Sequence, residues 1–125
     1  MRFRGKISLG TAFQIGPREI LTCAHNLYHR GYEEEAEAVS YVPAANGMVD
    51  LEALEGIRVS SFSYPSEYKN CKYEEKTKYE YAYGVLEKEC DAEVYFEWDR
   101  PNKKLEGTKI EICGYPSTKI DYTYN

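Results

Sequence analysis

The sequence predicts an all-β protein, and two observations carry that prediction. Short segments in which apolar and polar residues alternate recur about every 8–20 residues, with glycine, proline or asparagine between them. No segment longer than about ten residues shows convincing helical periodicity. A chain of 125 residues is long enough for one domain with a hydrophobic core and too short for two. A single β-barrel is the architecture that such a series of strands favours.

Composition excludes several classes of function. Hydrophobic residues make up 42% of the chain and charged residues 30%, as in soluble globular proteins. The formal net charge of −5 argues against a nucleic-acid partner, because binding phosphates needs a concentrated basic face. No run of about 18 apolar residues is present, so we expect no membrane span. The charged start of the chain is not followed by an apolar stretch, so we expect no signal peptide and leave the localisation open.

The N-terminal half supplies the clearest strand signals. Gly16-Pro17 interrupts an apolar run and predicts a hairpin turn between two strands, the second of which ends at His25. An acidic run follows, which we expect to be a solvated loop or one helical turn. The predicted elements are strands at 3–9, 10–16 and 18–25, one helical turn at 27–31, the acidic run at 31–37, a strand at 38–43 and a turn at 44–47.

The C-terminal half alternates strands with charged loops. In its first strand, Val59, Ser61 and Ser63 are predicted to share one face, because strand side chains alternate with a period of two. The predicted elements are a strand at 54–64, a surface turn at 65–70, an exposed charged loop at 70–78 and strands at 79–86, 93–98 and 107–116.

Cysteine and tyrosine usage gives no sign of a metal or cofactor. The four cysteines are widely spaced and form no Cys-x-x-Cys pair, so we expect no zinc site and no other cofactor. Nothing selects a disulfide pairing, and free buried thiols are the simpler expectation. The 13 tyrosines suit barrel surfaces and interfaces rather than a platform for stacking bases.

Residues around the predicted hairpin resemble a known family. Gly10-Thr11-Ala12-Phe13 and Leu21-Thr22-Cys23-Ala24-His25 resemble the segment that precedes the catalytic histidine of chymotrypsin-like (trypsin-like) serine peptidases. The glutamyl-endopeptidase branch is the most similar, because Asn26 stands where animal trypsins usually carry a cysteine. Two later segments, Pro65 to Asn70 and Gly114-Tyr115-Pro116, resemble the turn before the family's acid strand and the entry to its second barrel.

The resemblance implies a general base and its orienting acid. His25 would be the base, and Glu80 stands at the position of the acid, where the family carries aspartate. A carboxylate there accepts the imidazole Nδ1 proton and fixes the tautomer. The extra methylene of glutamate displaces the carboxylate by more than about 1 Å unless the strand shifts. The alternatives are a half-buried structural histidine and an exposed glutamate on a strand.

The family's nucleophile is not evident in the sequence. No serine lies in a Gly-x-Ser-Gly-Gly loop, whose backbone N–H groups would form an oxyanion hole. Cys23 is a poor substitute, because a residue two positions from His25 on one strand rarely brings its thiol within about 3 Å of Nε2. We therefore expect this chain to be inactive by itself.

The resemblance implies the first, six-stranded Greek-key barrel of the chymotrypsin-like two-barrel fold at residues 1–107. Residues 108–125 would begin the second barrel or link to it. The expected function is that of a serine endopeptidase homologue. The alternatives are a non-catalytic, protein-binding module of a larger assembly, and a fragment or one chain of a cleaved enzyme. The partner would be a protein or peptide, or a second chain that completes the fold, with contacts expected at Tyr81, Tyr83 and Tyr115.

Overall fold

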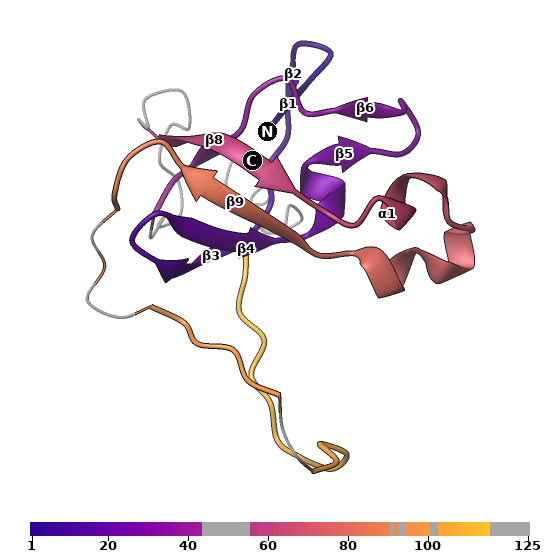
Figure 1. Ribbon diagram of the computed structural model, residues 1–125, viewed down its shortest axis with the longest axis vertical. Helices are drawn as coiled ribbons and strands as arrows, with labels where there is room; N and C mark the ends of the chain where they lie inside the picture. The colour runs from indigo at the N-terminus through magenta and orange to yellow at the C-terminus, as the bar shows by residue number, and fades with distance from the viewer. Residues whose placement is uncertain (44–55, 91, 93–94, 101–102, 116–125) are drawn as a thin grey trace, which may run out of the picture.

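A five-stranded antiparallel sheet forms the body of the protein in the computed structural model, which describes residues 1–43, 56–90, 92, 95–100 and 103–115. The sheet curls into a half-barrel (Figure 1). Each strand is hydrogen-bonded to its neighbours in the spatial order β3 (Ala12–Gly16), β4 (Glu19–Thr22), β9 (Ala82–Leu86), β8 (Ile57–Ser63) and β7 (Ser40–Tyr41).

Two small hairpins complete the β structure of the described residues. The predicted single strand at 3–9 is wrong: β1 (Arg2–Phe3) and β2 (Lys6–Ile7) pair with each other. The chain reverses between them because Arg4 and Gly5 have φ values of 47° and 75°, the left-handed conformation of tight hairpin turns. The second hairpin pairs β5 (Tyr28–His29) with β6 (Glu34–Glu35).

The position of the helical turn and the number of strands both differ from the prediction. Residues 27–31, predicted as a helical turn, instead enter β5, and the helical turn occurs earlier as the 3-10 helix η1 (Ala24–Asn26). The acidic run contributes the exposed strand β6. Instead of six strands in one barrel, the described residues form one five-stranded sheet and two hairpins. The predicted turn at 44–47 lies outside the described residues.

A β-bulge in β8 changes which side chains face the core. Val59 pairs with Leu86, but Ser61 pairs with Val85, so the register shifts by one residue between them. Past the shift, Phe62 packs against the core while Ser61 and Ser63 are exposed, so the two serines do not share the buried face of Val59 as predicted. A bulge has this effect because one extra residue reverses the alternation of side chains.

Two short helices lie between β8 and β9. They are α1 (Glu67–Asn70) and the 3-10 helix η2 (Tyr73–Tyr79). The predicted surface turn at 65–70 misjudged Tyr68, which is only 2% exposed. Among the described residues, no helix has the length and apolarity that crossing a bilayer requires.

The core has two parts. The larger part lies under the sheet and is built on Ile20, Leu27, Val39, Val59, Ala82, Leu86 and Cys90. The smaller part is aromatic, combining Ala24, Tyr28 and Tyr68 with the partly buried Tyr64 and Tyr79. The smaller part lies directly beneath η1 and therefore supports the turn that carries His25.

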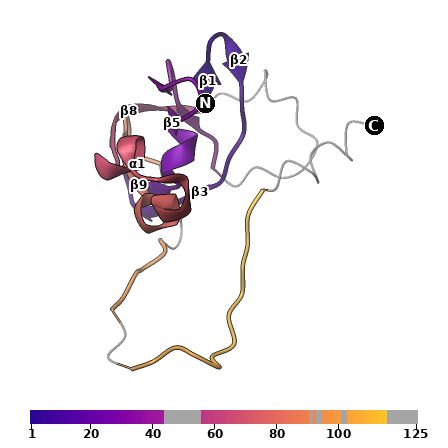
Figure 2. The ribbon, with the colours of Figure 1, turned by 90° about the vertical axis from the view of Figure 1, so that its right-hand side faces the viewer.

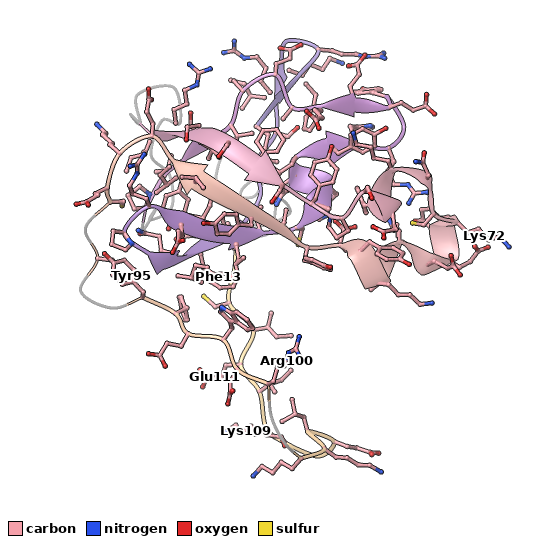
Figure 3. The ribbon with its side chains drawn as sticks, viewed as in Figure 1. Phe13, Lys72, Tyr95, Arg100, Lys109 and Glu111 are labelled. Atoms are coloured by element: carbon pink, nitrogen blue, oxygen red, sulfur yellow. The ribbon has the colours of Figure 1, made fainter. Side chains whose placement is uncertain are left out.

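Residues 95–100 and 103–115, called the arm below, form two extended stretches, one of which leaves the sheet and the other returns to it (Figures 1 and 2). Its ends are fixed by hydrogen bonds from Phe96 N–H to Gln14 O at 3.0 Å and from Tyr115 N–H to Thr11 Oγ1 at 2.8 Å. Arg100, Lys109 and Glu111 lie on the arm, away from the sheet (Figure 3). The predicted strands at 93–98 and 107–116 are wrong for the described residues of the arm, which contain no strand. The proposed division at residue 107 stays a prediction.

Candidate catalytic site

His25 is held in the turn that ends β4. Cys23 is still extended, with φ −88° and ψ 146°, and the chain then coils into η1. Ala24 is fully buried, and its carbonyl accepts a hydrogen bond from Leu27 N–H at 2.9 Å. A small buried residue before His25 thus lets the turn pack closely while the histidine side chain, 60% exposed, faces outward.

Asn26 fixes the other side of this turn. Its side chain is buried, and Nδ2 donates a hydrogen bond to Thr22 Oγ1 at 2.8 Å. Thr22 Oγ1 in turn donates to Thr11 O at 2.8 Å. Gly10 is in close contact with Asn26, because a Cβ atom at Gly10 would lie only 2.4 Å from Asn26 Oδ1. The Gly-Thr and Thr-Cys-Ala-His-Asn segments are therefore joined by one hydrogen-bonded network.

The structure brings His25 and Glu80 together. His25 Nδ1 lies 2.9 Å from Glu80 Oε1, and the backbone N–H of His25 donates to the same oxygen at 2.7 Å. The Glu80 side chain is 18% exposed, so the contact is shielded on the acid's side and open on the histidine's side. Two donors on one residue converge on one carboxylate oxygen, which fixes both the ring orientation and the turn.

Glu80 reaches His25 from the end of a helix rather than from a strand. It caps η2 with φ −83° and ψ 49°, and β9 begins only at Ala82, which pairs with Thr22. The predicted strand at 79–86 therefore starts too early. Because Glu80 precedes the ladder, its backbone is free of the sheet register, and this accommodates the longer side chain.

Tyr68 is a buried tyrosine next to the Glu80 carboxylate. Its ring packs edge-on against Tyr28 at 6.3 Å between centroids and lies in the aromatic part of the core. Burial and, after it, the charge of Glu80 and a hydrogen bond to that carboxylate raise the pKa of Tyr68 to about 12. A neutral tyrosine beside an ionised carboxylate is a donor that stabilises the charge.

Neither a thiol nor a serine joins this pair. Burial, followed by the charge of Glu80, raises the pKa of Cys23, so the thiol is held in its unreactive protonated form. Among the hydrogen bonds of the described residues, none joins a serine hydroxyl to His25. All four cysteines are free thiols. Within the described part of the chain, no cluster of three or more potential metal ligands occurs.

Sequence patterns do not reveal Arg30, Tyr68 or the cavity that both of them line. The cavity has a volume of about 640 Å³ and is lined by His25, Asn26 and side chains from β1, β5, α1 and η2. Arg30 lies in the predicted helical turn at 27–31, and Tyr68 lies in the predicted surface turn at 65–70. Their positions depend on contacts between segments about 40 residues apart, which local patterns do not reveal.

The fold is that of a chymotrypsin-like serine peptidase barrel. A Glu endopeptidase solved in complex with MPD has a similar structure, with a TM-score of 0.51 and 23% sequence identity. The likeness covers 70% of this chain and 38% of that chain. It confirms the predicted fold class and supports no particular branch of the family. No protein-family model matches the sequence, and no curated protein matches it.

Proposed function

We propose that this chain supplies the histidine and acid of a serine endopeptidase site, with His25 as general base and Glu80 as the residue that orients it. The contact of 2.9 Å between His25 Nδ1 and Glu80 Oε1 carries the proposal. A proton held on Nδ1 by a carboxylate leaves Nε2 as the basic nitrogen, and the exposed side of the ring is where a serine hydroxyl would have to approach.

The chain by itself should not hydrolyse peptides. Peptide hydrolysis by this mechanism needs a nucleophile and an oxyanion hole in addition to the base and its acid. No serine in the sequence has the flanking glycines of a Gly-x-Ser-Gly-Gly loop, which would supply both. We carry over the reaction class of the similar structure and not its preference for glutamate. At 23% identity the likeness is one of fold alone.

Activity-based labelling tests this part of the proposal. The 125-residue chain is incubated with a fluorophosphonate probe and, separately, with peptide esters. We expect neither labelling nor turnover. Labelling of any serine at one equivalent per chain would contradict the proposal, because it would show a complete nucleophile within these residues.

A second candidate function is that of a protein-binding module without catalysis. It is favoured by the large apolar side chains that the arm exposes, among them Trp98 at 71%, Ile110 at 71% and Ile112 at 90%. Apolar groups gathered on one segment usually mark an interface. Of the tyrosines expected at that interface, Tyr81 is 62% and Tyr115 is 42% exposed, whereas Tyr83 donates to Glu19 Oε1 at 2.8 Å.

A further inference from the structure

Residues 108–112, in the returning stretch of the arm, are extended and exposed. Ile110 is 71% and Ile112 is 90% exposed, and the outgoing stretch, residues 95–100, lies apart from them (Figure 2). Among the hydrogen bonds between described residues, none includes a backbone group of residues 109–113. An extended segment with free N–H and C=O groups is a template on which another strand can pair.

The side chains of this segment divide between two faces. Because strand side chains alternate, Thr108, Ile110 and Ile112 share one face, and Lys109 and Glu111 share the other. The first face carries only β-branched residues, which favour strands. The second carries one charge of each sign, and no salt bridge between described residues includes Lys109 or Glu111.

This pattern is complementary to itself. When two copies of the segment pair antiparallel about Ile110, Lys109 of each copy lies opposite Glu111 of the other, and Thr108 lies opposite Ile112. A shift by one residue would set the β-branched face against the charged face. A shift by two residues would set Lys109 opposite Lys109, or Glu111 opposite Glu111. One register therefore satisfies both charges.

The outgoing stretch offers no such match. Its acidic residues, Glu97 and Asp99, alternate with the exposed Phe96 and Trp98. In every antiparallel register that keeps the apolar residues on one face, Glu111 lies opposite Tyr95, Glu97 or Asp99, and none of these is a cation. The charges thus favour a second copy of residues 108–112 over the other half of the arm.

We propose that residues 108–112 pair with the same residues of a second copy of this chain, as an antiparallel ribbon with a two-fold axis at Ile110. The use of the arm as a contact rests on the second candidate function, that of a protein-binding module. The choice of partner and register rests on the two Lys109–Glu111 pairs and on the shared β-branched face. The pairing is independent of His25 and Glu80.

The mass of the chain in solution tests whether copies associate. A two-stranded ribbon is marginally stable by itself, so we expect a weak dimer. Light scattering of the 125-residue chain between about 10 µM and about 1 mM covers the range of small, weak interfaces. The mass should rise from 14.5 kDa toward twice that value. A mass of one chain at every concentration would overturn the proposal.

Charge reversal tests the register. Lys109→Glu and Glu111→Lys each create two like-charge pairs in the ribbon, and we expect each to weaken self-association by at least about tenfold. An equimolar mixture of these two variants should associate as the wild type does, because every cross-strand pair is then complementary. The double variant Lys109→Glu with Glu111→Lys should also associate as the wild type does. Failure of both rescues would contradict the register.

Variants elsewhere on the returning stretch control for the change in net charge. Lys104→Glu and Glu106→Lys change the charge of the chain equally, but neither residue belongs to the segment that pairs. We expect both to associate as the wild type does. Glu111→Gln removes a charge without reversing it and should weaken association only slightly, because exposed ion pairs contribute little. Losses in the controls equal to those in the reversals would overturn the assignment.

A disulfide between copies tests the two-fold axis. Ile110→Cys, combined with Cys113→Ser, places two thiols directly opposite each other, close to the separation that a disulfide needs. Diamide, which oxidises two thiols to a disulfide, should link these chains several-fold faster than chains with Leu105→Cys in the same background, because Leu105 does not lie opposite itself. Equal rates would overturn the register.

These measurements separate the pairing from the catalytic proposal. A chain that stays monomeric overturns the pairing and leaves the roles proposed for His25 and Glu80 unchanged. A dimer that both charge reversals leave intact also overturns the pairing, since another surface must then join the copies.

Discussion

The half-barrel and the arm contain the same kinds of residues with opposite burial. In the barrel, Leu86 is fully buried and Ile20 is 3% exposed, whereas in the arm Ile110 is 71% and Ile112 is 90% exposed. Ile110 and Ile112 alternate with polar residues as a strand would, but the described residues of the arm contain no strand. The difference shows that an alternating segment becomes a buried strand only when its neighbours supply a ladder and a core.

Truncating one apolar residue in each region gives the largest expected contrast. Leu86→Ala removes a fully buried side chain at the centre of the core, and we expect the free energy of unfolding to fall by about 2–5 kcal/mol. Ile112→Ala should change it by less than about 0.5 kcal/mol. Urea unfolding followed by circular dichroism measures both. Similar losses would show that the arm packs in solution.

The contact between Gly10 and Asn26 tests whether the turn carrying His25 is as tightly held as the core. Gly10→Ala places a methyl group against the buried Asn26 side chain, which must move, so we expect destabilisation by about 1–3 kcal/mol. Gly16→Ala is the control, because the added atom meets only the flexible end of Glu19. A Gly10→Ala protein as stable as Gly16→Ala would mean that the turn adjusts freely.

Substitutions in the arm should change the association of the chain with itself or with a partner rather than its stability. We expect the chain to self-associate or to bind a partner through its exposed apolar residues, and Ile110→Asp with Ile112→Asp to abolish this without lowering the midpoint of thermal unfolding. Light scattering at several protein concentrations measures the mass. Glu111→Gln, on the same segment, is the control. If the wild-type chain is monomeric and the two aspartate substitutions leave its partner binding unchanged, the proposal of a protein-binding module is contradicted.

Thiol reactivity gives a smaller contrast between the two regions. Burial and the Glu80 carboxylate raise the pKa of Cys23, so at pH 8 less of it is thiolate, and we expect it to react several-fold more slowly with iodoacetamide than the exposed Cys113 of the arm. Peptide mapping by mass spectrometry follows each site. Raising the pH should increase the rate at Cys23, because deprotonation limits it. Faster reaction at Cys23 would reopen a role for it as a nucleophile.

Apolar alternation and turn residues in the sequence predict the strands and the hairpin that form within a short stretch of chain. The β3–β4 hairpin, β7 and the strand β9 lie within predicted segments, because apolar alternation and the Gly16-Pro17 turn are visible in a short window. The hairpin at Arg4 and Gly5 was missed because its turn lies inside an alternating run. The bulge in β8 was missed because it depends on pairing with β9.

The residues of the candidate site also form two groups, those that sequence motifs identify and those that only contacts between distant segments define. His25 and Glu80 were singled out because their surroundings resemble a known order of motifs. The sequence does not single out Arg30 and Tyr68, because their roles depend on a hydrogen bond between residues 38 positions apart, from Arg30 Nη1 to Tyr68 O. The buried Gln14 illustrates the same limit, since its amide donates to Cys90 O at 3.0 Å across the sheet's end.

The position of the proton on His25 tests the central claim most directly. Long-range nitrogen–proton NMR correlations, recorded at a pH where the ring is neutral, identify which ring nitrogen carries the proton. We expect Nδ1–H in the wild type, because Glu80 Oε1 lies 2.9 Å away, and a shift of population toward Nε2–H in Glu80→Gln. Glu75→Gln, an exposed residue of η2, should leave the ring unchanged. A proton on Nε2 in the wild type, or no response to Glu80→Gln, would contradict the assignment of His25 as a general base oriented by Glu80.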